Sequence, residues 1–319
     1  MYIRNTQKGM DSGVNIKYSN LVINKTILLD SDNISEFNKY KNIKFLNIVF
    51  NKDLVFENCK FEKELIFENI KLNGDIYFKN CTFNENCIFK NVEFNKNSSK
   101  KRLFIKSKIK CQKLKFEKIK YMPRLDGVHF SHCCKVDLKS IFYEKENYKY
   151  AKINYRIAKN QSNIIGDYDK VSHYYYMERY YGGKCIKRDE FESLTEYINT
   201  KFIDLIAKYT IGYGEKPLNI FIVSFFIVSI FALLYMITGI KDINDNVIGL
   251  NYDNSNNIKS MLKDYLDLWY FSMATFSTVG YGDMVVNNIL GKLLVSLEVF
   301  FGVTMAASWA SVIFRKMSR

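Results

Sequence analysis

The 319-residue sequence predicts a multidomain fold: a β-solenoid, then an α-helical connector, then an all-α membrane segment. Three observations predict these parts. A six-residue unit recurs every 11 residues from residue 45 to 94, apolar residues next recur three and four apart, and two long apolar stretches follow residue 216. Such patterns are typical of solenoids, of helices and of membrane spans, respectively. The expected parts are a cap segment (1–42), the solenoid (43–138), the connector (139–216) and the membrane domain (217–319).

The repeat unit starts with phenylalanine, carries asparagine at its third position and, with one exception, ends with phenylalanine. The five copies are FLNIVF, FENCKF, FENIKL, FKNCTF and FKNVEF, which start at Phe45, Phe56, Phe67, Phe78 and Phe89. Polar triplets such as Glu62-Lys63-Glu64 separate the copies and suit turns. A short fixed period lets each face of a coil give one large side chain to a central stack. An antiparallel β-meander made of the same strands and turns is the alternative.

This pattern resembles the pentapeptide-repeat family, whose fold is a right-handed quadrilateral β-helix. The resemblance is good over residues 43–94 and fades toward Leu138. The family prefers a small residue two positions before the central one. Cys59 and Cys81 satisfy that preference, whereas Leu54 is one of three bulky exceptions, and the spacing alternates between five and six residues. The resemblance implies a β-helix rather than a meander, with the cysteines as small core residues.

Three helices are expected in the connector. Tyr148, Ala151 and Tyr155 fall on one face of the first helix, which should end at Gly166-Asp167. The second should run over residues 170–181 and stop at Gly182-Gly183, and the third should cover about residues 190–208. The third helix is amphipathic and directly precedes an apolar stretch. It therefore lies either at a membrane interface or against the soluble part of the chain, and the sequence leaves both open.

The two apolar stretches, Pro217–Ile240 and Ile289–Phe314, are long enough to cross a bilayer. Basic residues precede the first stretch and follow the second: Lys201, Lys208 and Lys216, then Arg315, Lys316 and Arg319. Positive charge collects on the cytoplasmic side of membrane proteins, so the sequence predicts a multi-pass protein of the cell (plasma or inner) membrane with both termini cytoplasmic. The basic, solenoid-bearing part would then be cytosolic and close to anionic membrane lipids.

The hexapeptide TVGYGD, Thr278 to Asp283, lies between the two apolar stretches. A row of backbone carbonyls can replace the water around a potassium ion, and glycine lets neighbouring carbonyls point the same way. From about residue 217 to the end, the chain is similar to two-transmembrane potassium channels. The resemblance implies an outer helix (217–240), a pore helix (264–277), a filter (278–283) and an inner helix (289–314). The similar run Thr210–Gly214 has no span before it and is expected to be a turn.

The resemblance also implies roles for single residues in a homotetramer, with K⁺ as the permeant ion and without a cofactor. The expected K⁺ ligands are Thr278, Val279, Gly280 and Tyr281, with Gly282 completing the filter. Filter support is expected from Tyr270, Phe271 and Asp283. Ala274 stands where some relatives carry a carboxylate that pairs with the filter aspartate, so that pair is absent.

Gating residues are expected on the inner helix, namely Glu298, Gly302, Ala306, Ala310 and Phe314. Gly302 could be a hinge or a close-packing residue, and Glu298 could tune cation sensitivity or serve as a structural hydrogen-bonding group. The hypothesis for gating is that the N-terminal part acts on the outer helix through Glu215-Lys216-Pro217. The alternative function is a membrane-anchored interaction protein, or a silent or regulatory channel subunit, that uses the solenoid as a docking surface.

Several other functions find little support. The net charge of +14 lies in the first 216 residues, but no motif that reads nucleic acid accompanies it, so no nucleic-acid partner is expected. A basic solenoid also cannot act as a DNA mimic. The three histidines, among them His173, have no nucleophile or carboxylate pattern around them, so no enzyme is expected. The cluster His129, His132, Cys133 and Cys134 fits no common zinc spacing, and metal binding there stays open.

Overall fold

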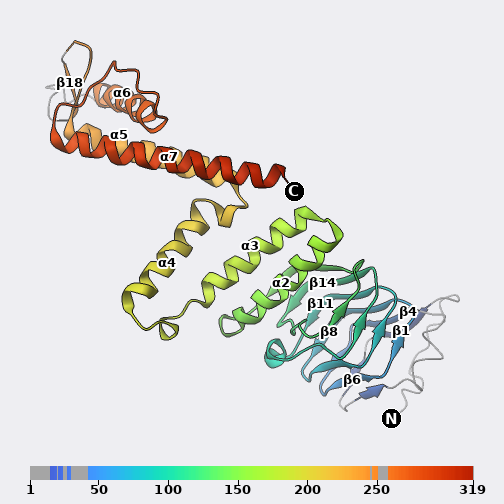
Figure 1. Cartoon of the computed structure of the whole chain (residues 1–319). Helices are drawn as coiled ribbons and strands as arrows, with labels where there is room; N and C mark the ends of the chain where they lie inside the picture. The colour runs from blue at the N-terminus through green and yellow to red at the C-terminus, as the bar shows by residue number, and fades with distance from the viewer. Residues whose placement is uncertain are drawn as a thin grey trace. The chain divides into compact units, whose positions relative to one another are not determined.

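The computed structural model describes residues 15–19, 21–23, 27–29, 42–244, 246–250 and 258–318. The chain divides into two compact units, Met1–Tyr197 and Ile198–Arg319. Figure 1 shows the strands of the first unit followed by helices, and the long helices of the second.

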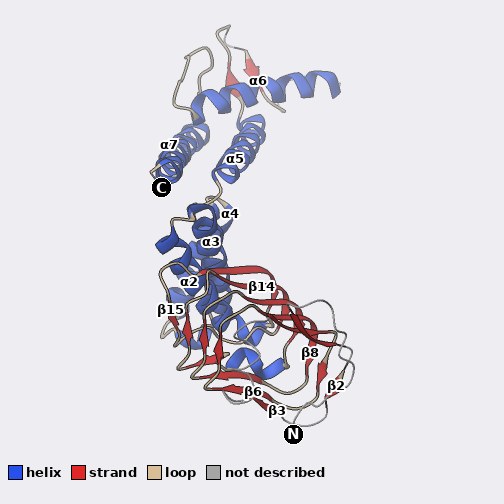
Figure 2. Cartoon of the chain, turned by 90° about the vertical axis from the view of Figure 1, so that its right-hand side faces the viewer, coloured by secondary structure: helices blue, strands red, loops and turns tan. Residues whose placement is uncertain are grey.

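The first unit begins with a β-solenoid made of three parallel sheets (Figure 2). The largest sheet has the order β1 (Asn15–Ser19), β4 (Asn42–Leu46), β8 (Leu65–Leu72), β11 (Cys87–Glu93), β14 (Lys113–Lys120) and β16 (Lys135–Phe142), with β5 (Val49–Phe50) between β2 (Val22–Ile23) and β8. The second sheet is β15 (His129–Phe130), β13 (Lys108–Ile109), β10 (Thr82–Phe83) and β7 (Lys60–Phe61). The third is β12 (Phe104–Ile105), β9 (Ile76–Lys79), β6 (Leu54–Glu57) and β3 (Ile27–Leu29).

The strand register shows how the sequence repeat maps onto the coil. Ile43 pairs with Leu65, and Leu65 pairs with Cys87, so one turn of the solenoid takes 22 residues. The 11-residue repeat is therefore half a turn. The next turn is longer, because Cys87 pairs with Leu114 and the extra residues form the short helix η1 (Lys96–Lys100). Because these pairings are parallel, the antiparallel meander is wrong.

The phenylalanines of the repeat form ring stacks inside the coil. Phe45, Phe67 and Phe89 stack with ring centroids 4.9 Å apart, and Phe56 stacks on Phe78 at 4.7 Å. Successive repeats thus contribute their phenylalanine rings alternately to two different stacks. These rings are at most 3% exposed, which places the core of the solenoid on its axis. Stacked aromatic pairs add about 0.5–1.5 kcal/mol each beyond the area that they bury.

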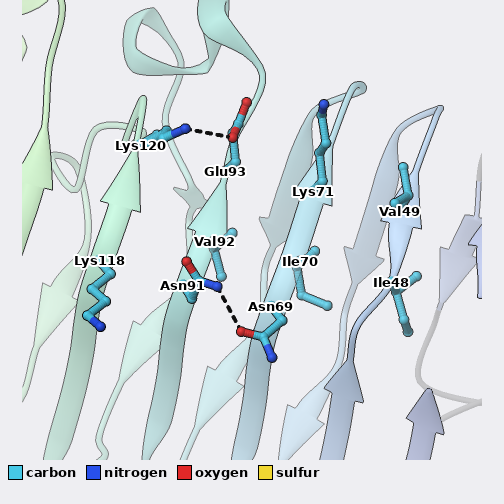
Figure 3. A pocket seen from close by; sticks show the side chains of 10 residues that line it. All are labelled: Ile48, Val49, Asn69, Ile70, Lys71, Asn91, Val92, Glu93, Lys118 and Lys120. Atoms are coloured by element: carbon cyan, nitrogen blue, oxygen red, sulfur yellow. Dashed lines mark hydrogen bonds and ion pairs between the residues drawn. The ribbon is translucent and has the colours of Figure 1, made fainter. Parts of the chain in front are cut away.

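The invariant asparagines occupy corners of the coil. Asn47, Asn58, Asn69, Asn80 and Asn91 all have φ between 50° and 56°, a left-handed conformation that asparagine tolerates better than most residues. Their side chains bond along the axis: the Asn91 amide donates to Asn69 at 2.8 Å (Figure 3). The Asn69 amide in turn donates to Asn47 at 2.9 Å. The asparagine therefore suits the backbone of the corner and adds a ladder of side-chain hydrogen bonds, although Lys118 and Ser140 adopt the same φ (54° and 55°) at the equivalent positions of later turns.

The solenoid is longer than residues 43–138. Strands β1, β2 and β3 fall in the segment expected to be a cap, yet they pair with β4, β5 and β6 in the same sheets. At the other end β16 continues the ladder to Phe142. The repeat pattern misses both ends because the end strands lack the phenylalanine-asparagine signature, although β16 still alternates buried and less buried residues over Lys135–Leu138. Residues 30–41 of the expected cap lie outside the described residues.

A helical hairpin covers the last turn of the solenoid. It consists of α2 (Tyr148–Ile165), preceded by η2 (Lys145–Asn147), and α3 (Tyr168–Cys185). In α2, the Asn154 carboxamide accepts from the amide of Leu125 and donates to the carbonyl of Pro123, both at 2.9 Å. In α3, the Tyr174 hydroxyl accepts from the amide of Leu138 at 3.0 Å. The hairpin thus satisfies polar groups at an edge that would otherwise attract further strands.

Gly166 ends α2 in a left-handed conformation, as expected, but α3 does not stop at Gly182-Gly183. It runs on to Cys185, and Lys184 lies 4.3 Å from the centre of the Tyr180 ring and 4.8 Å from that of Tyr148. Such cation–π contacts favour the last turn of α3, against the roughly 1 kcal/mol that each helical glycine costs. A further link joins the two helices at Glu178. Burial alone would raise the pKa of Glu178, but hydrogen bonds from Lys159 and Arg156 outweigh it and lower that pKa.

The second unit holds the helices of the membrane domain. The first unit ends with η3 (Arg188–Glu190), and α4 (Leu194–Tyr209) crosses the boundary between the two units. The second unit continues with η4 (Gly212–Gly214), α5 (Pro217–Thr238), β17 (Ile240–Lys241), β18 (Val247–Ile248), α6 (Ile258–Phe276) and α7 (Ile289–Met317). Within the described ranges, α5 and α7 are long and apolar enough to cross a membrane. Helix α6 starts six residues before the expected Asp264, α5 stops two residues early at Gly239, and α7 extends three residues past Phe314. Arg315 and Lys316 suit the C-terminal end of α7 because cations stabilise it there.

Candidate functional site

The candidate site is the loop between α6 and α7, with α5 packed behind both helices. Phe231 and Tyr235 of α5 form a core with Leu268 and Phe271 of α6. At the far end of the loop, Asn288 caps α7 and also donates to the carbonyl of Thr238 at 2.5 Å, which joins the end of α5 to the start of α7. The loop is therefore held at both ends by all three helices.

The backbone of TVGYGD is bonded to the last turn of α6. The amide of Thr278 donates to the carbonyl of Thr275 at 3.0 Å, and the amides of Val279 and Gly280 donate to the carbonyl of Ala274 at 3.0 and 3.2 Å. Thr278 has φ 59° and Gly280 has φ 55°. Within a single chain the loop is open, with Val279 54% and Tyr281 69% exposed.

The structure brings two of the three expected support residues next to the loop. The rings of Tyr270 and Tyr281 stack almost in parallel, with centroids 6.1 Å apart. Asp283 lies near the Tyr270 hydroxyl. Phe271 instead points to the outer helix, where its ring meets that of Tyr235 edge to face at 5.1 Å. Consecutive residues of a helix point in directions about 100° apart. Tyr270 therefore contacts the loop, whereas Phe271 contacts α5.

Glu298 is fully buried and links the three helices. Its carboxylate accepts from the Tyr235 hydroxyl of α5 at 2.7 Å and from the Ser272 hydroxyl of α6. Ser272 is itself 2.9 Å from the carbonyl of Val228 on α5. A buried carboxylate needs such partners, because an unpaired charge in a membrane interior is costly. The arrangement agrees with the structural reading of Glu298.

The expected gating residues lie on two sides of α7. Gly302 is on the buried side with Glu298, and a Cβ atom at that position would overlap the carbonyl of Phe276 at the end of α6. Ala306, Ala310 and Phe314 lie on the exposed side, with Phe314 75% exposed. Gly302 thus occupies a point of close backbone approach between the inner helix and α6, as the close-packing reading requires.

The turn before α5 contacts the end of α7. The run Thr210–Gly214 forms a turn, as expected, with Gly212, Tyr213 and Gly214 all at positive φ. Arg315 of α7 donates to the carbonyl of Gly214 and lies 3.4 Å from the Glu215 carboxylate. Glu215 is only 6% exposed, so this ion pair is partly shielded from solvent.

Sequence reasoning identified the loop and Glu298 but missed their partners. Tyr235, Ser272, Asn288 and Arg315 were not singled out for these contacts. The sequence held a usable signal only for the partners of Glu298. A carboxylate in an apolar span requires hydrogen-bond donors, and hydroxyl groups on the other apolar helices can supply them. The contacts of Asn288 and Arg315 join residues 50 and 101 positions apart, and no local pattern indicates them.

No metal centre is formed by the histidine-cysteine cluster. Among the described residues, no three His, Cys, Asp or Glu side chains are placed to share an ion. Cys134 is buried with its sulfur 3.8 Å from that of Cys111, whereas Cys133 is exposed. Cys59 and Cys81 are core residues, as expected.

A pocket of about 260 Å³ lies on the solenoid surface and contains none of the predicted site residues (Figure 3). Ile48, Ile70 and Val92 line its floor, and Lys120 at its edge pairs with Glu93 at 3.1 Å. The pocket follows from the stacking of successive turns.

Two family models match this chain. Residues 246–319 match the family described as "Ion channel", and residues 43–99 match "Pentapeptide repeats (9 copies)". The chain combines an ion-channel pore domain with pentapeptide repeats. The first match contains α6, the TVGYGD loop and α7, and the second contains the phenylalanine-asparagine units. The matched family is one of ion channels and not of enzymes.

Two curated relatives that match part of this chain are named as potassium channels. Two pore potassium channel a from Oryza sativa subsp. japonica is 32% identical over 88 residues, which cover 28% of this chain and 23% of the relative. Potassium channel K2 from Plasmodium berghei (strain Anka) is 30% identical over 107 residues, which cover 33% of this chain and 7% of the relative. The chain thus spans less than a quarter of either relative's length. No solved structure matches the chain.

Proposed function

We propose that this chain is one subunit of a potassium-selective channel in which four copies bring their TVGYGD loops around a shared axis. The observation that carries the proposal is the position of this hexapeptide. It fills the loop between α6 and α7 inside the segment that matches the ion-channel model. Both curated relatives are named as potassium channels.

The geometry of the loop supports a filter made of carbonyl groups. The amides of Thr278, Val279 and Gly280 are engaged by the end of α6. Main-chain oxygens from Thr278 to Tyr281 would then serve as K⁺ ligands, with Gly282 ending the row. One chain supplies only part of an ion's coordination shell, so a ring of subunits is required. The exposed Val279 and Tyr281 side chains offer surface for neighbouring copies.

The surroundings of the loop suggest how its diameter is held. The Tyr270 ring lies parallel to that of Tyr281, and its hydroxyl is near Asp283. This contact would take the place of the absent carboxylate at Ala274. Phe271 would contribute indirectly, by packing α6 against α5. The C-terminal end of α6 also carries a partial negative charge that favours a cation next to the loop.

The membrane orientation and the gate form the second part of the proposal. Lys216 directly precedes α5, and Arg315 and Lys316 lie in the last turn of α7, which supports cytoplasmic termini by the positive-inside rule. The N-terminal repeat domain would bias the pore through the turn at Glu215. Because Arg315 binds this turn, a displacement of the turn reaches the inner helix directly. Ala306, Ala310 and Phe314 on the exposed side of α7 are the proposed pore-lining gate residues.

The test is potassium flux from liposomes that contain the purified protein. Wild-type protein should conduct K⁺ and exclude Na⁺, and Gly280→Ala should abolish selective flux. Residue 280 needs φ 55°, which costs an alanine about 1–2 kcal/mol, while no atom lies within 4 Å of an added Cβ that would prevent folding. Gly182→Ala in helix α3 is the control, because its added Cβ only meets the Lys152 side chain at 3.7 Å.

Two outcomes would contradict the proposal. Preserved K⁺ selectivity in Gly280→Ala would remove the loop from the conduction path. Absence of flux from correctly assembled wild-type protein would favour the alternative, in which the solenoid is a docking surface and the pore domain is an anchor or a silent subunit.

A further inference from the structure

The sheet formed by β7, β10, β13 and β15 carries a row of exposed lysines on its outer face. Lys106, Lys108 and Lys110 are exposed and alternate with the buried Ser107 and Ile109, so the three lysines point outward. Alternate residues of an extended strand are about 6.6 Å apart, which sets the spacing of Lys108 and Lys110. These three residues are called the lysine row.

The neighbouring strands do not neutralise the lysine row. Lys108 pairs in register with Thr82 on β10 and with His129 on β15, and neither residue is acidic. On β7 of the same sheet, by contrast, Lys60 forms an ion pair with Glu62. Within the described part of the chain, no member of the lysine row takes part in an ion pair. The row therefore presents three uncompensated positive charges.

The segment after α3 carries a matching row of carboxylates. Asp189, Glu190 and Glu192, called the carboxylate row, are exposed, and none forms an ion pair among the residues that the structure describes. Arg188 donates to the carbonyl of Phe191 at 2.6 Å. Phe191 has an extended backbone, with φ −122° and ψ 138°. Glu190 and Glu192 on either side of it are therefore spaced like two neighbours of the lysine row.

One copy of the chain does not bring the two rows together. Both rows belong to the unit Met1–Tyr197, so their separation is a property of one compact unit. In Figure 1 the segment after α3 lies beyond the end of that helix, apart from the strands of the solenoid. Opposite charges left on two separate surfaces of a chain are complementary between copies. In a ring, each copy would give its carboxylates to one neighbour and its lysines to the other, which is a closed heterologous contact.

We propose that the lysine row of one copy binds the carboxylate row of a second copy of this chain. The contact joins the N-terminal units of neighbouring subunits. It rests on the assembly of copies in the proposed function, and it is independent of ion selectivity. Exposed ion pairs are individually weak and are screened by salt. The contact holds because the pore domains keep the copies together, which makes it effectively intramolecular.

The test is cross-linking of two differently tagged full-length copies that are expressed together. One copy carries Lys108→Cys and the other carries Glu192→Cys, so a product with both tags arises only between copies. Cys133 and Cys185 are first replaced by serine, because the other five cysteines are buried. The cross-linker is a short bis-maleimide. Lys90→Cys in place of Lys108→Cys is the matched control, since Lys90 is exposed on strand β11 of another sheet.

The yield of the product with both tags decides the proposal. We expect about threefold or more product with Lys108→Cys than with Lys90→Cys at low salt. This excess should disappear in about 1 M KCl, where the screening length falls to about 3 Å. Equal yields at low salt would overturn the proposal, and an excess that salt does not reduce would overturn the ionic role of the two rows.

A charge exchange identifies the partners. Adding Lys106→Glu and Lys110→Glu to the copy with the cysteine at position 108 should remove the excess. Adding Asp189→Lys and Glu190→Lys to the other copy should restore it, because the attraction forms again with the charges exchanged. Failure of the exchange to restore the product would overturn the assignment of the rows to each other.

The mass of the uncross-linked complex, measured on the same samples, separates this proposal from the proposed function. A protein that stays monomeric would contradict both the channel assembly and this contact. An assembled protein that lacks the excess product would contradict the contact alone.

Discussion

At the scale of single residues, Glu298 joins α7 to α5 and α6 by hydrogen bonds. Replacing it with alanine leaves the Tyr235 hydroxyl without its acceptor in a buried site, whereas the Ser272 hydroxyl can still donate to the carbonyl of Val228. An unpaired buried hydroxyl costs about 1–3 kcal/mol, so Glu298→Ala should clearly lower the thermal stability of the detergent-solubilised protein. Glu298→Gln keeps one carbonyl acceptor and should therefore lower the thermal stability less than Glu298→Ala does.

Ser296→Ala is the matched control for Glu298, two residues away on the exposed side of α7. Its hydroxyl bonds only to the carbonyl of Lys292 in its own helix, and its loss should be close to neutral. If Glu298→Ala were as stable as Ser296→Ala, the carboxylate would not hold the helices together.

What the sequence can reveal at this scale depends on how local the cause is. The repeated asparagine stands out from Asn47 to Asn91 because the same local backbone recurs there every 11 residues. Glu298 stands out because a carboxylate is rare in an apolar helix. Its partner Tyr235 is 63 positions away, and one sequence alone contains no signal that relates the two.

At the scale of elements, the contact between α6 and α7 depends on Gly302. A Cβ at this position overlaps the carbonyl of Phe276, where α6 leads into the TVGYGD loop. Gly302→Ala should therefore push α7 away from α6 and destabilise the protein by about 1–3 kcal/mol, with a loss of K⁺ over Na⁺ selectivity in liposome flux. Val303→Ala, on the exposed side, should leave selectivity intact.

The hinge reading of Gly302 predicts a different result. A hinge glycine sets how easily the inner helix bends, so its replacement would alter open probability while stability and selectivity stay at wild-type levels. Observation of that pattern would contradict the packing role argued from the Phe276 contact.

The existence and type of the elements could be predicted from sequence better than their ends. Periodicity and composition predict a solenoid and both apolar helices, the family resemblance implies a β-helix rather than a meander, and the turn at residues 210–214 is expected because no span precedes it. The first strands of the solenoid, the start of α6 at Ile258 and the continuation of α3 past its glycines are not predicted. Those ends are decided by tertiary contacts, such as the pairing of β1 with β4, which outweigh local propensity.

At the scale of the whole molecule, the gating hypothesis depends on one connection between the pre-span turn and the inner helix. Glu215 is nearly buried and Arg315 is partly exposed, so breaking their ion pair should cost about 1–2 kcal/mol after solvent screening. That energy corresponds to a change of roughly 5- to 30-fold in a two-state equilibrium. Arg315→Glu should therefore shift open probability in single-channel recordings by about that factor, while K⁺ selectivity stays unchanged.

A charge exchange distinguishes a specific contact from general damage. Glu215→Arg alone should also shift open probability, and the double variant Glu215→Arg with Arg315→Glu should move it back toward the wild-type value, because the attraction is restored with the charges exchanged. Lys316→Glu is the control, since it changes the same net charge one residue further along α7 and is not part of the contact with Gly214 and Glu215. If the shifts in open probability of the two single variants simply add in the double variant, the turn does not act on the gate through Arg315. The N-terminal domain must then reach the pore by another route.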